Sequence, residues 1–182
     1  ARALWGNIEG ERFWCELHGE NVERPATRKR MFGHSRMLPP DWRTPDKIHE
    51  CARQLMMGAA RRLRRSEFAA TKLTLSARGG GYRDARGSRP DDHKWSKELV
   101  FRPARDDRAL LAHLREAVQA FAQTTSFKPR SIGVVLHGLE PADEPQGDLF
   151  GEAAGVGRSM EVRRRDEKLS EALDELRAAH GP

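Results

Sequence analysis

Acidic side chains are the first candidates for catalysis, because nucleotidyl transfer needs carboxylates that converge on metal ions. Two close pairs occur, Asp91 with Asp92 and Asp106 with Asp107. The first pair stands in a segment rich in Gly and Arg, and the second precedes a segment with helical periodicity. These are the settings of turn residues and helix caps. We therefore interpret both pairs as structural and expect no metal-dependent active site.

No other set of residues has the spacing of a reactive centre. Gly79–Gly81 is a glycine run without the strand, the following Lys and the helix of a phosphate loop. The seven His residues are scattered, and Cys15 and Cys51 lie in no metal-binding motif, which favours two reduced thiols. A nucleophilic Cys51 would have to act from a helix that needs it in the core. This chain alone is predicted to be no enzyme and to hold no cofactor.

The charge of the chain indicates binding instead. Its 182 residues include 33 Lys and Arg against 27 Asp and Glu, which gives a formal net charge of +6. Two short runs, residues 28–30 and 61–65, concentrate the cations. Lys and Arg displace condensed counterions from phosphates, so an excess of them favours a polyanionic partner. The alternative is an ordinary solvated basic surface.

Two predicted strands place cations on one face of a sheet. Residues 71–78 alternate between apolar and polar side chains, and residues 94–102 do so too, except that Lys97 interrupts the apolar side. Few aromatic side chains lie on the polar face of these strands. This disfavours binding of single-stranded nucleic acid by base stacking and favours contacts with the backbone of a duplex. An RNA-binding module on a similar four-stranded sheet is the alternative. The polar face combines cations and small hydroxyls that suit phosphate contacts: Lys72, Thr74, Ser76, Arg78, Lys94 and Arg102.

The remaining periodicities complete the fold. In chain order, the predicted elements are a strand at 31–38, a helix that Thr44 caps, the two strands just described, a helix capped by Asp106 or Asp107, and a strand at 131–139. Each strand has one apolar face to cover and one face free. The order β-α-β-β-α-β therefore predicts an α+β domain, with a four-stranded antiparallel sheet and two helices on one face.

Changes in composition divide the chain. Residues 1–22 are interpreted as the end of a preceding domain, 23–30 as an exposed basic linker, and 31–140 as the domain itself. Residues 141–162 are predicted to form a flexible acidic tether, and 163–182 a short amphipathic C-terminal helix. The first residue is Ala rather than Met, which favours a fragment of a longer protein. Because the chain has neither a bilayer-spanning apolar run nor a signal peptide, we expect it to be cytoplasmic.

Three stretches and the C-terminal end carry a resemblance to a known family. The stretches are RMFGHSRMLP at 30–39, IGVVLHGLEP at 132–141 and QGDLF at 146–150, and the chain ends with KLSEALDELRAAHG at 168–181. With the predicted element order, they resemble the little-finger domain and tail of bacterial Y-family translesion DNA polymerases of the UmuC and DinB branch. Residues 5–22 resemble the end of the thumb domain in that family.

The resemblance implies that the sheet face lies against duplex DNA near the primer end. The family's palm motifs, which carry the catalytic carboxylates and Mg²⁺, have no counterpart here. The resemblance therefore implies that any polymerase activity resides outside these residues, and it leaves open whether the parent protein is an active polymerase or a defunct one. It also implies a role in translesion synthesis and DNA repair in the SOS response. The first strand and its basic lead-in would contact the phosphate backbone at Arg28, Lys29, Arg30, Gly33, Ser35 and Arg36.

The segment QGDLF is similar to the peptide Gln-Leu-x-Leu-Phe with which this family binds the bacterial sliding clamp. Leu149 and Phe150 are paired apolar anchors beside Asp148, and Gln146 would supply oriented hydrogen bonds. Gly147 replaces the usual Leu, so the affinity is expected to be modest. The alternative is a tail that folds back onto the domain. For the C-terminal helix, a recombinase, an accessory polymerase subunit and the domain itself are the partners left open.

Overall fold

The computed structural model describes residues 6–23, 29–80, 93–142 and 160–180. Within those ranges no helix is long and apolar enough to cross a membrane. The predicted order of strands and helices is confirmed. In chain order the elements are helix α2 (Ile8–Leu17), strand β1 (Met31–Met37), the 3-10 helix η1 (Pro40–Trp42), helix α3 (Pro45–Arg65), strands β2 (Phe68–Arg78) and β3 (Lys94–Ala104), helix α4 (Asp107–Thr124), strand β4 (Ser131–Pro141) and helix α5 (Met160–His180).

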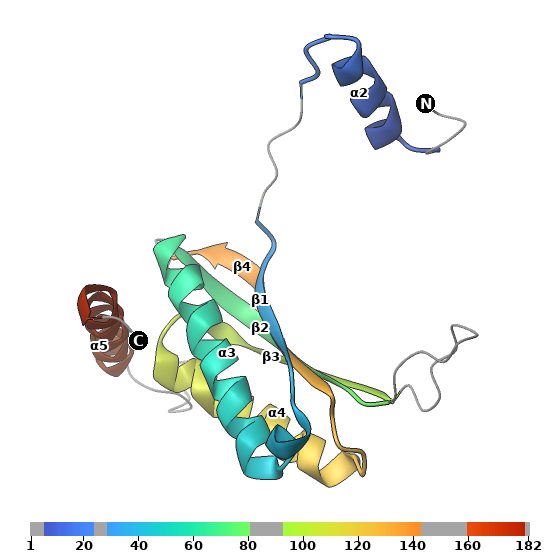
Figure 1. Ribbon diagram of the computed structural model, residues 1–182. Coiled ribbons are helices and arrows are strands. Elements are labelled where there is room, and N and C mark those ends of the chain that lie inside the picture. The colour runs from blue at the N-terminus through green and yellow to red at the C-terminus, as the bar shows by residue number, and fades with distance from the viewer. Residues whose placement is uncertain (1–5, 24–28, 81–92, 143–159, 181–182) are drawn as a thin grey trace.

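The strands form one antiparallel sheet in the order β1-β4-β2-β3. Helices α3 and α4 lie on one face of this sheet (Figure 1) and bury their apolar side chains against it. In the described part of the chain, the opposite face has no helix over it. The predicted α+β fold, with two helices on one side of four antiparallel strands, is confirmed.

The two covering helices begin at capping residues, as predicted, but only one cap uses its side chain. At the start of α4, the Asp106 carboxylate accepts a hydrogen bond from the Ala109 backbone N–H at 2.8 Å, which confirms the predicted cap. Thr44 has the extended backbone of a cap residue before α3, yet its side chain makes no capping hydrogen bond. Thr44 is therefore the N-cap residue, as predicted, and Pro45 in the first turn contributes its fixed φ.

Strands β2 and β3 show the predicted alternation. Leu73 and Leu75 of β2 are buried under the helices, whereas the polar side chains between them point to the opposite face. Lys97, which interrupts the apolar parity of β3, extends from the edge strand to within 3.9 Å of the Glu116 carboxylate on α4. Because β3 is an edge strand, this ammonium group reaches both solvent and an acid, so the interruption costs the domain little stability.

Because of a β-bulge, strand β2 begins earlier than its sequence pattern predicts. The strand begins at Phe68 rather than Thr71, and its register shifts between Ala70 and Lys72. The Thr71 hydroxyl donates to the Gly138 carbonyl of β4 at 2.8 Å, and Gly138 has a φ of +63° that favours glycine. Because the bulge reverses the side-chain parity, the alternation seen from Thr71 onward does not continue back to Phe68.

Helix α5 docks on the domain, so the domain itself is a partner of this helix. It begins at Met160 rather than 163 and is 21 residues long, which makes it longer than predicted. The Ser170 hydroxyl is buried and accepts a hydrogen bond from the Asp107 backbone N–H at 3.0 Å. Its apolar residues Leu169 and Leu176 remain 59% and 56% exposed. The helix therefore contacts the domain through its polar face.

The centre of this contact is Arg64, near the end of α3, which is only 5% exposed. Its guanidinium donates to the Asp107 carboxylate of α4 at 2.6 Å and to the Asp174 carboxylate of α5 at 2.8 Å. It also donates to the Arg105 carbonyl at 2.8 Å. Arg61 lies 3.4 Å from Asp174 on the same side of α3. One buried cation thus joins three helices.

Replacing this cation is expected to destabilise the domain strongly. The substitution Arg64→Met leaves two carboxylates without their buried partner, and we expect it to lower the free energy of unfolding by about 3–5 kcal/mol. Urea denaturation followed by circular dichroism measures the change. The control is Arg53→Met on the same helix, which removes an exposed pair with Glu50 and should change the stability by less than about 1 kcal/mol. Equal effects of the two substitutions would contradict the role of Arg64.

Candidate nucleic-acid interface

The uncovered face of the sheet consists of alternate side chains from all four strands. The pairing register brings these side chains into rows that cross the strands in the order β1, β4, β2 and β3. Arg102 is exposed further along β3, where the register with β2 is irregular between Val100 and Ala104. The rows are Met37, Ser131, Arg78 and Lys94; Ser35, Gly133, Ser76 and Ser96; Gly33, Val135, Thr74 and Glu98; and Met31, His137, Lys72 and Val100.

The first row places two cations side by side. Arg78 and Lys94 are Cα partners at one end of β2 and β3, and both are exposed. Their neighbour in the row is the hydroxyl residue Ser131. This end of the face therefore offers positive charge and a hydroxyl donor together, which are the groups that contact phosphate oxygens.

The second row is low in relief. It consists of Ser35, Gly133, Ser76 and Ser96. A Cβ atom at Gly133 would lie 2.8 Å from the Ser76 hydroxyl oxygen and 3.4 Å from the Ser35 Cβ, so glycine keeps this strip flat. Because no large side chain projects from this row, an extended binding partner could approach the backbone of the strands closely beside the cationic row.

The other two rows contain an acid that the sequence prediction did not place on this face. The Glu98 carboxylate lies 3.6 Å from the Lys72 ammonium and 3.3 Å from Nε2 of His137. The same His137 nitrogen is 2.9 Å from the Thr74 hydroxyl. Lys72 and Thr74, both predicted contacts, are therefore engaged with neighbours on the face. Positive charge is correspondingly strongest at the Arg78 end.

The basic lead-in to β1 faces the end of α3. The Lys29 ammonium donates to the Ser66 hydroxyl at 3.3 Å, and Arg62 donates to the Gly33 carbonyl at 3.0 Å. These residues and the exposed Arg65 line an open groove of about 600 Å³ beside the edge strand. The groove adds a second cationic region next to the sheet.

Several predicted contacts lie elsewhere. Arg36 pairs in register with the buried Ile132, so it points to the helix side of β1, where it donates to the Gln54 side chain at 3.4 Å. Arg30 is exposed just before β1. Arg28 lies outside the described residues, as do the predicted clamp contacts Gln146, Asp148, Leu149 and Phe150.

The cationic run at the end of α3 does not act as one surface. Arg61 and Arg64 face Asp174 of α5, whereas Arg62 and Arg65 face the groove beside β1. Helical periodicity places Arg61 and Arg64 on a different face from Arg62 and Arg65. Sequence alone could not tell which face is used for packing, because the partner on α5 lies far along the chain.

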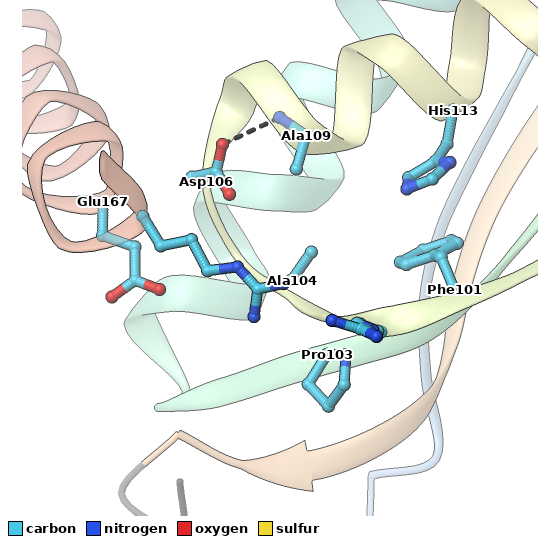
Figure 2. A pocket seen from close by; sticks show the side chains of 9 residues that line it. Phe101, Pro103, Ala104, Asp106, Ala109, His113 and Glu167 are labelled. Carbon is cyan, nitrogen blue, oxygen red and sulfur yellow. Dashed lines mark hydrogen bonds between the residues drawn. The ribbon is translucent and has the colours of Figure 1, made fainter. Parts of the chain in front are cut away.

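A small hollow lies at the opposite edge of the sheet, between β3, α4 and α5 (Figure 2). Its volume is about 200 Å³. Phe101 stacks on the His113 ring with 4.2 Å between centroids, and burial raises the pKa of the Glu167 carboxyl. Arg102 of β3 and Arg163 of α5 also line the hollow. The hollow thus lies where β3 and α4 meet the N-terminal half of α5.

No described group has the geometry of a catalytic centre. Among residues 6–23, 29–80, 93–142 and 160–180, no cluster of three or more His, Cys, Asp and Glu side chains could hold a metal ion. Cys51 is fully buried, and burial raises the pKa of its thiol, so the reactive thiolate is disfavoured. The site that the described chain offers is the uncovered sheet face with its cationic borders.

The fold and this face define a β-α-β-β-α-β domain with one free polar sheet surface. Residues 29–149 match the model of the impB/mucB/samB family C-terminal domain. The chain belongs to this family. The match covers β1 to β4 and the first four residues of QGDLF, and it confirms the family resemblance stated from the sequence.

Solved structures with a similar fold include a Y-family DNA polymerase chimera, at 13% identity and a TM-score of 0.49 over 76% of this chain and 37% of that chain. DinB from Sulfolobus solfataricus matches at 14% identity and a TM-score of 0.46, over 75% of this chain and 37% of that chain. The little finger domain of PolIV, solved in complex with the β-clamp processivity factor, matches at 17% identity and a TM-score of 0.44, over 65% of this chain and 97% of that chain. This chain thus spans little more than a third of the two polymerases.

Proposed function

We propose that this chain is the part of a Y-family translesion DNA polymerase that holds duplex DNA and docks on the sliding clamp. The observation that carries the proposal is the uncovered sheet face, where the register places Arg78 beside Lys94 and next to a flat row of small residues. Catalysis by paired carboxylates and Mg²⁺ would belong to another part of the parent protein. Residues 1–22 would be the end of its thumb domain.

Electrostatics favour a nucleic acid on this face. Lys and Arg that neutralise phosphates release condensed counterions, which supplies most of the affinity that does not depend on base sequence. Hydroxyl groups of Ser35, Ser76 and Ser96 lie between the cations and can donate to phosphate oxygens. Glu98 opposes binding, and its nearness to Lys72 and His137 reduces that cost.

The face favours duplex backbone over single strands. Recognition of single-stranded RNA on a four-stranded sheet depends on outward aromatic rings that stack on bases. The rows across this face contain no Phe, Tyr or Trp, since Phe32, Trp95 and Phe101 point to the helix side of the described sheet. Contacts would therefore be made with the sugar-phosphate backbone.

Clamp docking is proposed from the segment that follows β4. The family match includes most of QGDLF, and the PolIV little finger with a similar fold was solved with the β-clamp. Leu149 and Phe150 offer paired apolar anchors for a hydrophobic pocket. Docking on a ring that encircles DNA would turn weak backbone contacts into intramolecular ones and raise their effective concentration.

Removal of the paired cations should weaken duplex binding. For Arg78→Ala with Lys94→Ala we expect the slope of log K against log salt to become shallower by about 2, because about 0.9 counterions are released for each neutralised phosphate. Fluorescence anisotropy with a primer-template duplex across a salt series measures this slope. The matched control is Arg53→Ala with Arg115→Ala, which removes two exposed cations from the helix layer. Indistinguishable slopes for the two double variants would contradict the proposed face.

A substitution of opposite sign tests the same surface. Glu98→Gln removes the carboxylate from the face and frees Lys72, so duplex affinity should rise several-fold at low salt and less at high salt. The same anisotropy series reports it. An unchanged or weaker affinity would mean that DNA does not approach this part of the sheet.

Competition between nucleic acids separates the two candidate partners. Unlabelled duplex DNA should displace the labelled duplex at lower concentration than an equal length of single-stranded RNA does. Stronger displacement by the RNA would favour the RNA-binding alternative.

The docking segment makes a separate prediction. Leu149→Ala with Phe150→Ala should abolish capture of the chain by immobilised bacterial sliding clamp, while duplex binding without the clamp stays unchanged. Gly147→Leu should strengthen capture, because it restores the apolar contact that the family peptide has. Full clamp capture by the double variant would refute docking through this segment.

A further inference from the structure

Strand β1 forms one edge of the sheet, and α3 packs beside it (Figure 1). The two elements are joined by Arg62, near the end of α3. Its guanidinium donates to the Gly33 carbonyl of β1 at 3.0 Å and to the Gly58 carbonyl of its own helix at 3.3 Å. These two hydrogen bonds hold a cation of the helix layer at the border of the sheet.

The groove beside β1 is continuous with the uncovered face of the sheet. Met31 and Gly33 line the groove, and they also begin two of the rows that cross that face. The groove takes its positive charge from Lys29, Arg62 and Arg65, and none of the described residues that line it is acidic. Cations from the helix layer therefore border the face directly.

Two further contacts direct the charge of the groove. The Lys29 ammonium donates to the Ser66 hydroxyl at 3.3 Å and lies 5.6 Å from the centre of the Phe32 ring. Arg65 is exposed in the last turn of α3. The carbonyl groups at the end of a helix carry about half a negative elementary charge, which would oppose an anion. The three cations of the groove outweigh that charge.

The groove lies at the opposite corner of the face from the paired cations Arg78 and Lys94. That pair belongs to the row of Met37, whereas the groove opens at the rows of Gly33 and Met31. Met31 and Met37 are six residues apart on β1, which corresponds to about 20 Å along a strand. Successive phosphates of one DNA strand are about 3.4 Å apart along the axis. The two cationic regions would therefore contact different phosphates of one duplex.

We propose that Arg62 and Arg65 of α3, together with Lys29, form a second contact for the phosphate backbone of duplex DNA in the groove at the β1 border. This inference rests on the proposed function and adds to it two side chains from the helix layer. A duplex that lies diagonally across the face from Arg78 and Lys94 reaches this groove. Positive charge at both corners would hold the duplex on the face between them.

The test is the double variant Arg62→Ala with Arg65→Ala, measured in the complete chain with the same primer-template duplex and salt series. We expect the slope of log K against log salt to become shallower by about 1–2, because two cations that neutralise phosphates are lost. The control is again Arg53→Ala with Arg115→Ala, which should leave the slope close to that of the unchanged chain.

The outcomes separate this inference from the proposed function. An unchanged slope for the groove variant, together with a shallower slope for the Arg78 and Lys94 variant, overturns the inference and leaves the proposed function standing. Unchanged slopes for both variants overturn both. Unchanged duplex binding with weaker capture by immobilised sliding clamp would assign the groove to a protein partner, and it would also overturn the inference.

A single charge reversal tests the groove without removing the Arg62 hydrogen bonds. Arg65 is exposed, so Arg65→Glu should leave the domain folded, which circular dichroism verifies. We expect duplex affinity at low salt to fall several-fold, and the loss should shrink as salt is raised. The matched control is Arg53→Glu, an equal change of charge at an exposed position of the same helix. Equal affinities of the two variants would overturn the contact at Arg65.

Discussion

The buried guanidinium of Arg64 is the interaction on which the end of the domain depends. It joins α3 to α4 through Asp107 and to α5 through Asp174. Burial raises the pKa of the Asp107 carboxyl and Arg64 lowers it, so a cation and an acid that would each be costly alone stabilise one another. The main effect of such a cluster is to fix the relative positions of the helices that it joins. Every donor direction of a planar guanidinium restricts where α4 and α5 can lie.

This cluster divides the arginines of the domain between structure and binding. Arg61 and Arg64 are used to hold α5, whereas Arg62 and Arg65 line the groove beside β1. Helix α5 contributes Asp174 and Glu171 to this contact. The net charge of the chain is modest, yet Arg78 and Lys94 stand side by side at one end of the sheet face. Placement more than total charge makes that face suitable for a polyanion.

The sequence predicts the fold well, because the strands and helices have clear periodicities. The order of elements, the two covering helices and the outward parity of Lys72 to Arg78 all follow from local patterns. What it missed depends on contacts between distant residues. The bulge at Thr71 needs Gly138, and the role of Arg64 requires Asp174. Glu98 has the same parity as Lys94 and Ser96, so the local pattern could have placed it on the outward face, and only its contact with His137 needed the structure. The direction of Arg36 toward the helix side could not be inferred from its family position, since one step along a strand changes the face.

The sheet order also has a consequence for how the domain forms. Strand β4 is the last of the four in the chain, yet it lies between β1 and β2 and is the only described strand that pairs with β1. During synthesis, β1 therefore has no strand to pair with until residues 131–137 have been made. Pairing over such a sequence separation closes a large loop, which slows folding. The uncovered face cannot exist in a partly made chain, so a truncation before the end of β4 should remove the whole surface rather than part of it.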